Sequence, residues 1–246
     1  MARRRSSKKR RKFAGLLRLG FLLAAAIAVG LYFSPPKDLR RWLSEREGMA
    51  RVEGHAELIR SAAVESGLDP NLLAGVMMVE SRGHLAAESK AGALGLFQLM
   101  LPTAADQARL MGLKPPSKQE LLTNGVLNAR LGAGYLAWLH PRFDGELERA
   151  LIAYNTGPGR LKRLILEAGS YAAWRDARER AGDSKLLSYA RDVEHYRQRF
   201  ADRGAIAPTA QQAPSVPAAD DGRGSGLDGV PAAPGRIGPL ESNPKQ

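Results

Sequence analysis

One segment of this 246-residue chain constrains the rest more than any other, namely the 21 residues from Phe13 to Phe33. The segment carries one charge, Arg18, and is otherwise almost entirely apolar. A helix of about 20 apolar residues spans the hydrocarbon core of a bilayer. Residues 1–12, in front of it, hold eight Lys and Arg and no acid, which places the N-terminus on the cytoplasmic side. The segment therefore predicts a single transmembrane anchor at 13–33 behind a cytoplasmic basic arm, with the rest of the chain outside.

Two alternatives for this end of the chain differ in what they imply. A cleaved signal peptide has a shorter apolar core, about 7–15 residues, but this reading stays open. Nucleic-acid binding is not expected, because eight of the net +12 charges lie in residues 1–12. The remainder is only mildly basic, as ordinary soluble domains are.

Composition divides the rest of the chain into three parts. Residues 204–246 contain seven prolines and few large apolar residues, so they cannot bury enough surface to fold and are expected to be disordered. Residues 34–54 are interpreted as a linker, and 55–203 as the folded domain. The chain has no cysteine, which excludes disulfides, thiolate metal sites and a cysteine nucleophile. The four histidines show no metal-binding spacing, so neither a metal nor a cofactor is expected.

The periodicity of the folded part is helical nearly throughout, and no stretch alternates with a period of two. Gly67 is placed to end one helix, and Asp69 followed by Pro70 is typical of the start of the next. The fold class is therefore mainly α. The expected helices cover residues 55–66, 71–81, 102–111, 124–140, 146–155, 160–168 and 184–203.

Glu80 is the first candidate catalytic residue. It follows Leu73, Val76 and Met77 by seven, four and three residues, so it shares their apolar face of a helix. Burial disfavours the ionised carboxylate and raises its pKa, and the negative end of the helix dipole acts in the same direction. These conditions suit a carboxylic acid that donates its proton near neutral pH. The alternative is a structural glutamate paired with a group such as Arg82.

The segment after this helix has the composition of a ligand-binding loop. Gly92 and Gly95 allow the backbone to approach a ligand closely. Gln98 offers a donor and an acceptor among apolar neighbours, as a neutral sugar requires. Phe97 and Met100 would supply apolar surface beside it. The alternative is a loop that only packs on the core.

These residues carry a resemblance to a known family. Glu80-Ser81, Ser89, the run from Gly92 to Met100 and Pro102-Thr103-Ala104 resemble the signature of soluble-type lytic transglycosylases. These enzymes cleave peptidoglycan and are related to goose-type lysozyme. Two further motifs of the family follow in the expected order over residues 55–200. They are Ala153-Tyr154-Asn155 before Gly157-Pro158-Gly159, and Tyr189-Ala190-Arg191-Asp192-Val193.

The resemblance implies a lysozyme-like helical domain and a role for each matching residue. Glu80 matches the catalytic glutamate of the family. The substrate-binding residues that match are Ser89, Gln98, Met100, Tyr154, Asn155 and Tyr189. Two positions depart from the family pattern: Phe97 replaces the usual Met, and Lys185 replaces the usual acid four residues before the motif Tyr. The second departure leaves Tyr196 as a rival to Tyr189.

The resemblance also implies a reaction. Glu80 protonates the glycosidic oxygen between N-acetylmuramic acid and N-acetylglucosamine, and then takes a proton from the C6 hydroxyl as a 1,6-anhydro sugar forms. The implied partner is the glycan strand of peptidoglycan, and the implied location is the inner membrane of a bacterium with the domain on the periplasmic side. Glu88 and Asp106 are the nearest candidates for a second carboxylate, so a hydrolytic muramidase of the same fold stays open. A non-catalytic module that binds the cell wall is the remaining alternative.

Overall fold

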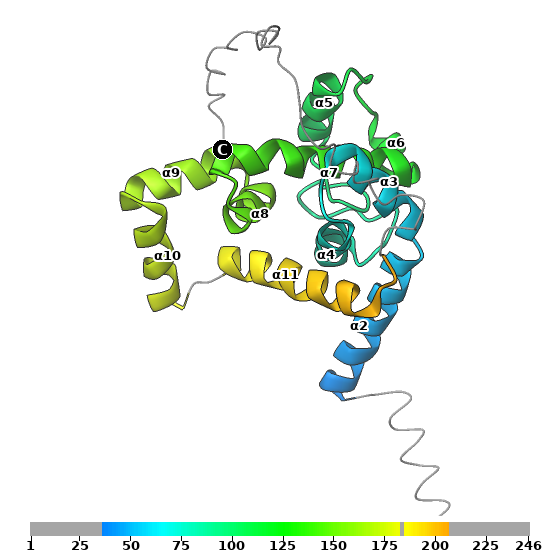
Figure 1. Ribbon diagram of the computed structural model, residues 1–246, viewed down its shortest axis with the longest axis horizontal. Coiled ribbons are helices and arrows are strands. Elements are labelled where there is room, and N and C mark those ends of the chain that lie inside the picture. Colours follow the sequence, from blue (N-terminus) through cyan, green and yellow to red (C-terminus); the bar gives the residue numbers. More distant parts are fainter. Residues whose placement is uncertain (1–35, 183–184, 207–246) are drawn as a thin grey trace, which may run out of the picture. The chain divides into compact units, whose positions relative to one another are not determined.

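The computed structural model describes residues 36–182 and 185–206, all within one compact unit (Figure 1). This part of the chain is helical, as predicted, and contains two isolated antiparallel bridges but no strand. The helices are α2 (Lys37–Glu53), α3 (Ala56–Ser66), α4 (Pro70–Ser81), α5 (Leu101–Leu110), α6 (Lys118–Thr123), α7 (Gly125–Leu139), the 3₁₀ turn η1 (His140–Phe143), α8 (Leu147–Thr156), α9 (Pro158–Ala168), α10 (Tyr171–Arg180) and α11 (Lys185–Arg203).

Three helices lie where the sequence analysis did not place one. The segment 34–54 was expected to be a linker, yet α2 occupies most of it. Its mean polarity is high and only Gly48, Met49 and Val52 are buried, so its apolar pattern is weak. The short helix α6 starts with a capping box between Ser117 and Glu120, and α10 is rich in charge. All three helices pack on the rest of the domain, and this packing stabilises them although their apolar periodicity alone does not predict a helix.

Helix α4 forms the centre of the domain, with eight of its twelve residues buried. It packs against α3, α2 and, most extensively, α11, which runs below it in Figure 1. Gly75 makes this crossing possible. A Cβ atom there would lie 2.6 Å from the carbonyl oxygen of Val193 and 3.0 Å from the backbone nitrogen of Arg197. The backbones of α4 and α11 are therefore in direct contact.

The first end of α4 is fixed by side chains and the second by the backbone conformation of Arg82. The Asp69 carboxylate accepts a hydrogen bond from the backbone N–H of Asn71, and Pro70 occupies the first helical position, as predicted. Arg197 of α11 donates to the same carboxylate at 2.7 Å. At the other end Arg82 adopts the left-handed conformation (φ 52°) that stops the helix. The position of Glu80, two residues earlier, is thus set by a rigid helix.

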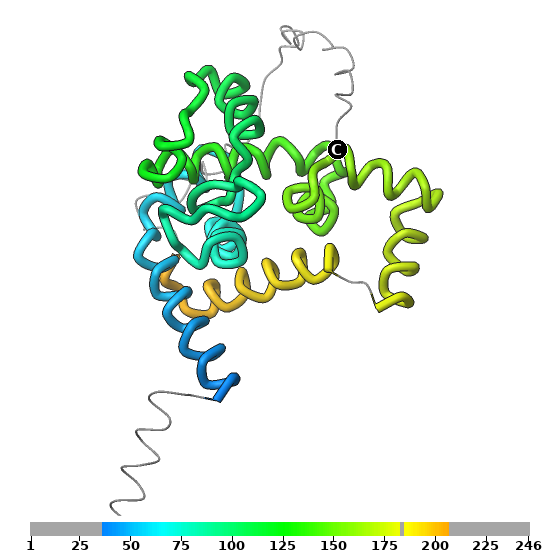
Figure 2. Tube along the Cα trace, turned by 180° about the vertical axis from the view of Figure 1, so that it is seen from behind, coloured from blue at the N-terminus to red at the C-terminus, as the bar shows by residue number. Residues whose placement is uncertain are grey.

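The remaining helices complete the domain on the two sides of α4. The view from behind in Figure 2 shows α3, α5, α6 and α7 grouped at one side, whereas α9 and α10 lie at the other. Helix α11 contacts both α4 and α8, so it brings these two helices together at the centre of the domain. The functional candidates on α4, α8 and α11 are therefore neighbours although more than 100 residues separate the first from the last.

The predicted anchor at 13–33 and the tail at 207–246 lie outside the described residues. Within 36–182 and 185–206, no helix combines the length and apolarity needed to cross a bilayer.

Candidate active site

Glu80 lies in the last turn of α4, mostly buried but still partly open to solvent. Burial raises the pKa of its carboxyl group to about 7, and a hydrogen bond from Tyr189 opposes this rise. The Tyr189 hydroxyl donates to Oε1 of Glu80 at 2.6 Å. Arg82, the structural partner considered from the sequence, donates instead to the Ser44 hydroxyl at 2.5 Å. The site therefore holds a carboxyl group that can exchange a proton near neutral pH.

Two tyrosines accompany Glu80 in the interior. Tyr189 of α11 and Tyr154 of α8 are both buried, and burial together with the neighbouring Glu80 carboxylate raises the pKa of each well above its ordinary value. Both phenols therefore keep their protons and act as hydrogen-bond donors. The Tyr154 ring also lies 5.3 Å from that of Tyr135 on α7, measured between centroids.

The loop between α4 and α5 folds back on itself beside these residues. Leu94 and Leu99 exchange two backbone hydrogen bonds of 3.0 Å, which closes a tight turn around Leu96 and Phe97. Gly95 is required in this turn for two reasons. Its φ is 76°, and a Cβ atom would lie 2.2 Å from Nδ2 of Asn128. The predicted close-approach glycine thus approaches the protein's own side chain.

Three side chains from three helices hold the tip of this loop. The Ser81 hydroxyl at the end of α4 donates to the carbonyl of Leu96 at 2.8 Å. The Asn128 amide oxygen on α7 accepts from the N–H of Phe97 at 2.8 Å, and the Tyr154 hydroxyl donates to the carbonyl of Phe97 at 2.9 Å. The loop is therefore attached to α4, which carries Glu80, and to α7 and α8.

Two of the predicted sugar-binding residues have their polar groups engaged within the loop. The Ser89 hydroxyl accepts from the N–H of Ala93 at 3.0 Å. The Gln98 amide nitrogen donates to the carbonyls of Ala87 and Gly95 at 3.1 and 3.0 Å, although Gln98 was expected to offer this donor to a ligand. These bonds also hold Gln98 at φ 45°, a conformation that few residues other than glycine adopt. Both side chains therefore stabilise the conformation of the loop through these bonds.

The other two predicted binding residues lie at the surface. Met100 is exposed at the N-terminus of α5, and Asn155 is exposed in the last turn of α8. Among the described residues, neither they nor Ser89 and Gln98 form a hydrogen bond with Glu80.

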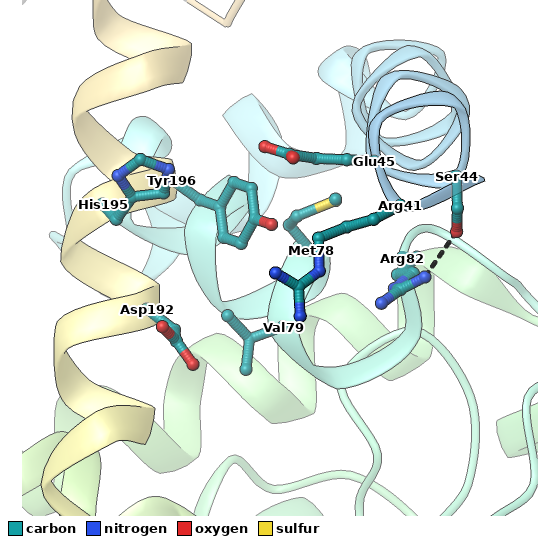
Figure 3. Close-up of a pocket in the computed structure, with 9 residues that line it drawn as sticks. All are labelled: Arg41, Ser44, Glu45, Met78, Val79, Arg82, Asp192, His195 and Tyr196. Carbon is teal, nitrogen blue, oxygen red and sulfur yellow. Dashed lines mark hydrogen bonds between the residues drawn. The ribbon is translucent and has the colours of Figure 1, made fainter. Parts of the chain in front are cut away.

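Tyr196, the rival of Tyr189, faces a different place. It lines a groove of about 680 Å³ between α2, α4 and α11. Figure 3 shows that Arg41 and Arg82 also lie there. Met78 and Val79, beside Glu80 in the sequence, line this groove, but Glu80 does not. Of the two tyrosines, Tyr189 is the one that contacts the carboxyl group.

The candidates for a second carboxylate are engaged in ion pairs at the surface. Glu88 accepts from Lys118 at 2.7 Å, and Asp106 accepts from Arg109 at 2.7 Å. In the described part of the chain, no group of three or more His, Cys, Asp and Glu side chains has the arrangement of a metal site. The arrangement is that of a single buried carboxyl group, Glu80, with a tyrosine hydrogen-bond donor, Tyr189.

Two residues of the site escaped the sequence analysis. Asn128 is completely buried and bonds to the loop through both ends of its amide. Tyr135 contacts Tyr154 and is stacked with Trp138. A polar residue inside the apolar pattern of α7 was the available signal for Asn128, whereas Tyr135 looked like any aromatic residue on a helix face.

Comparisons with known proteins agree with this geometry. The family described as Transglycosylase SLT domain matches residues 57–177. A membrane-bound lytic murein transglycosylase C of Histophilus somni is 36% identical over 123 residues, 47% of this chain and 34% of the relative. An endo-type membrane-bound lytic murein transglycosylase A of Klebsiella pneumoniae is 31% identical over 162 residues, 63% of this chain and 77% of the relative.

Solved structures give the same result for the fold. The lytic transglycosylase Slt of Pseudomonas aeruginosa, solved as an inactive mutant, aligns with a TM-score of 0.53 at 29% identity over 62% of this chain and 24% of that one. The soluble lytic transglycosylase SLT70 of Escherichia coli aligns with a TM-score of 0.51 at 21% identity, over 63% and 26%.

The chain belongs to the family of lytic transglycosylases with an SLT domain. The predicted resemblance is thereby confirmed. The chain spans about a third of the length of the transglycosylase C relative and about a quarter of the two aligned structures.

Proposed function

We propose that the chain is a peptidoglycan lytic transglycosylase. It cleaves the β-1,4 bond between N-acetylmuramic acid and N-acetylglucosamine and leaves a 1,6-anhydro end. The observation that carries the proposal is the Glu80 carboxyl group, whose pKa is raised to about 7 by burial beside the Tyr189 hydroxyl. The SLT family and the names of the relatives support the substrate class.

Glu80 acts first as a general acid. Because the Tyr189 hydroxyl donates to Oε1, the acidic proton of the neutral carboxyl group is carried by Oε2. Oε2 gives this proton to the glycosidic oxygen as the bond from C1 to that oxygen breaks. The ionised carboxylate that remains keeps the same hydrogen bond from Tyr189.

Glu80 then acts as a general base. Its carboxylate takes the proton of the C6 hydroxyl while O6 forms a bond to C1, so no water is consumed and the acid is regenerated. A pKa near 7 serves both steps, because neither protonation state is strongly disfavoured. Most glycosidases use two carboxyl groups. Here the ion pairs of Glu88 and Asp106 favour a single one, with the substrate's N-acetyl group stabilising the sugar cation.

The other predicted site residues are assigned supporting roles. Tyr154 holds the loop tip against the catalytic helix through the carbonyl of Phe97. Ser89 and Gln98 set the shape of the loop that lines the sugar site. Met100 and Asn155 supply exposed contacts for neighbouring sugars.

The proposed location is the inner membrane, with residues 13–33 as the anchor and the catalytic domain on the periplasmic side. The basic arm at 1–12 and the apolar segment behind it support this orientation. Two relatives are themselves named membrane-bound.

The product masses test the proposed reaction. Purified peptidoglycan digested with the full chain should yield muropeptides with 1,6-anhydro ends, each lighter by one water than the hydrolytic product. Mass spectrometry distinguishes the two directly. Reducing ends in place of anhydro ends would make the chain a hydrolytic muramidase, and glycan binding without released product would make it a wall-binding module; either result contradicts the proposal.

Replacing Tyr189 with Phe should change the pH dependence of the reaction. The hydrogen bond from Tyr189 lowers the pKa of Glu80, so its removal raises that pKa further above 7. Activity that needs the protonated acid falls as the pH rises through this pKa, and the falling limb should therefore move to higher pH. The rate at the optimum should drop about tenfold, because the carboxyl group loses its orienting donor.

The matched control is Tyr196→Phe, which removes a hydroxyl from the same helix in the groove of Figure 3. Its pH–rate profile should coincide with that of the unaltered chain. Equal displacement of both profiles would argue against Tyr189 as the partner of Glu80.

A further inference from the structure

The first turns of α2 carry apolar side chains that the rest of the domain leaves uncovered. Leu39, Trp42 and Leu43 are 37%, 52% and 40% exposed. Separations of three and four residues place them on one face of the helix, and Arg46 continues that face. Figure 1 shows this end of α2 projecting away from α4 and α11.

This face is not a core face that has lost its partner, because α2 is already packed through its other side. Gly48 and Val52 are buried there, whereas Met49, seven residues after Trp42, is buried on the side of Trp42 further along the helix. Arg82, at the end of the catalytic helix, donates to Ser44. Arg199 of α11 forms an ion pair with Glu45, and Arg203 pairs with Glu53 at 2.7 Å. The helix is thus attached to α4 and α11 through its middle and second half, while the apolar face of its first turns stays uncovered.

The charges around the exposed face are mostly positive. Residues 37–46 contain Lys37, Arg40, Arg41 and Arg46 against Asp38 and Glu45. The Arg46 guanidinium lies 5.4 Å from the centroid of the Trp42 ring. Tryptophan and leucine beside basic side chains suit the boundary between acyl chains and anionic headgroups.

The position of α2 in the chain brings a bilayer within reach. Only residues 34–36 separate Phe33, the end of the apolar segment, from Lys37. The four peptide steps from residue 33 to residue 37 span at most about 14 Å. A membrane that holds residues 13–33 therefore also holds the first turn of α2 near its headgroups.

We propose that the face formed by Leu39, Trp42 and Leu43 lies in the headgroup region of the membrane, on anionic phospholipid. This inference rests on the proposed anchor at 13–33. Because α2 is bonded to α4 and α11, its contact with the bilayer sets the orientation of Glu80 relative to the membrane surface. Helix α2 precedes residues 57–177, which match the family.

Quenching of Trp42 fluorescence by brominated lipid tests the proposal. The full chain with Trp138→Phe and Trp174→Phe retains Trp42 as its single tryptophan. In vesicles of phosphatidylcholine and phosphatidylglycerol, bromine on the acyl chains near the headgroups should remove about half of its emission. If these replacements prevent folding, the same loss is measured as the difference between the unaltered chain and Trp42→Phe.

Three variants check that the effect belongs to this face. A tryptophan introduced by Leu166→Trp in α9, in a chain with all three natural tryptophans replaced by Phe, should be unaffected by the brominated lipid. Leu39→Glu with Leu43→Glu should at least halve the quenching of Trp42. Val126→Glu, at an exposed apolar residue of α7, should leave it unchanged.

Three results would overturn the proposal. They are a chain that does not float with the vesicles, a floating chain whose Trp42 is not quenched, and a Trp42 shielded from aqueous iodide but not quenched by lipid. The last would mean that protein covers the face. Peptidoglycan digestion by the chain in these vesicles is measured separately, so that this test is distinct from that of the proposed function. Quenching without digestion would support the membrane contact and contradict the proposed function. Digestion without quenching would contradict the membrane contact and leave the proposed function supported.

Discussion

Glu80→Gln should lower peptidoglycan cleavage by about 1,000-fold or more while the domain stays folded. The amide has almost the shape of the carboxyl group and can still accept the hydrogen bond from Tyr189. Its N–H protons are not acidic, so it cannot protonate the glycosidic oxygen, and it cannot take a proton from the C6 hydroxyl. Release of soluble fragments from purified peptidoglycan measures the loss.

Glu88→Gln is the matched control, because it makes the same chemical change in an exposed ion pair with Lys118. Its activity should stay within about twofold of the unaltered chain, as surface ion pairs contribute little. Glu80→Gln with more than a tenth of the original activity, or an equal loss from Glu88→Gln, would remove Glu80 from the mechanism.

Glu80→Gln should also be more stable than the unaltered chain at high pH. Glu80 keeps its proton up to a pH of about 7 in the folded state, whereas in the unfolded chain it ionises near 4.5. The stability that neutral Glu80 allows is therefore fully present below pH 4.5 and is lost as the pH rises to 7. Glutamine has no such loss. The free energy of unfolding of the variant should exceed that of the unaltered chain by about 3 kcal/mol at pH 8, with no difference at pH 4.

Local chemistry accounts for what the sequence predicted about this site. The cap formed by Asp69 and Pro70 located the start of α4, and the period of its apolar residues placed Glu80 on the buried face. Both signals act within a few residues. The partnership of Glu80 with Tyr189 spans 109 positions, and only the family resemblance indicated it.

The features that the sequence missed depend on contacts between distant segments. Helix α2 is held by ion pairs with α11, about 150 residues away, and its own polar sequence resembles a linker. Gln98 looked like a free amide, but its nitrogen bonds to carbonyls that reach it only when the loop has closed. Asn128 bonds to backbone groups 31 and 34 positions earlier. A periodic pattern indicates which face of a helix is buried, but it does not indicate which backbone N–H or carbonyl groups of other segments a buried side chain will bond to.

Asn128→Leu should destabilise the domain by about 3–5 kcal/mol, a large part of the stability of a domain this size. Asn128 is completely buried, accepts from the N–H of Phe97, and donates to the carbonyls of Leu94 and Leu121 at 3.0 and 3.1 Å. Leucine has a similar volume but leaves these groups without their bonds, so the loop beside Glu80 loosens and cleavage should fall as well.

Asn124→Ala provides the comparison for this prediction. Asn124 caps the same helix, accepting from the N–H of Leu127 at the exposed N-terminus of α7, and its loss should cost about 1 kcal/mol. Urea unfolding of the full chain, followed by circular dichroism, measures both variants. If Asn128→Leu unfolds at the same urea concentration as Asn124→Ala, then the buried amide does not hold the loop. The geometry of the site would in that case depend on Ser81 and Tyr154 alone.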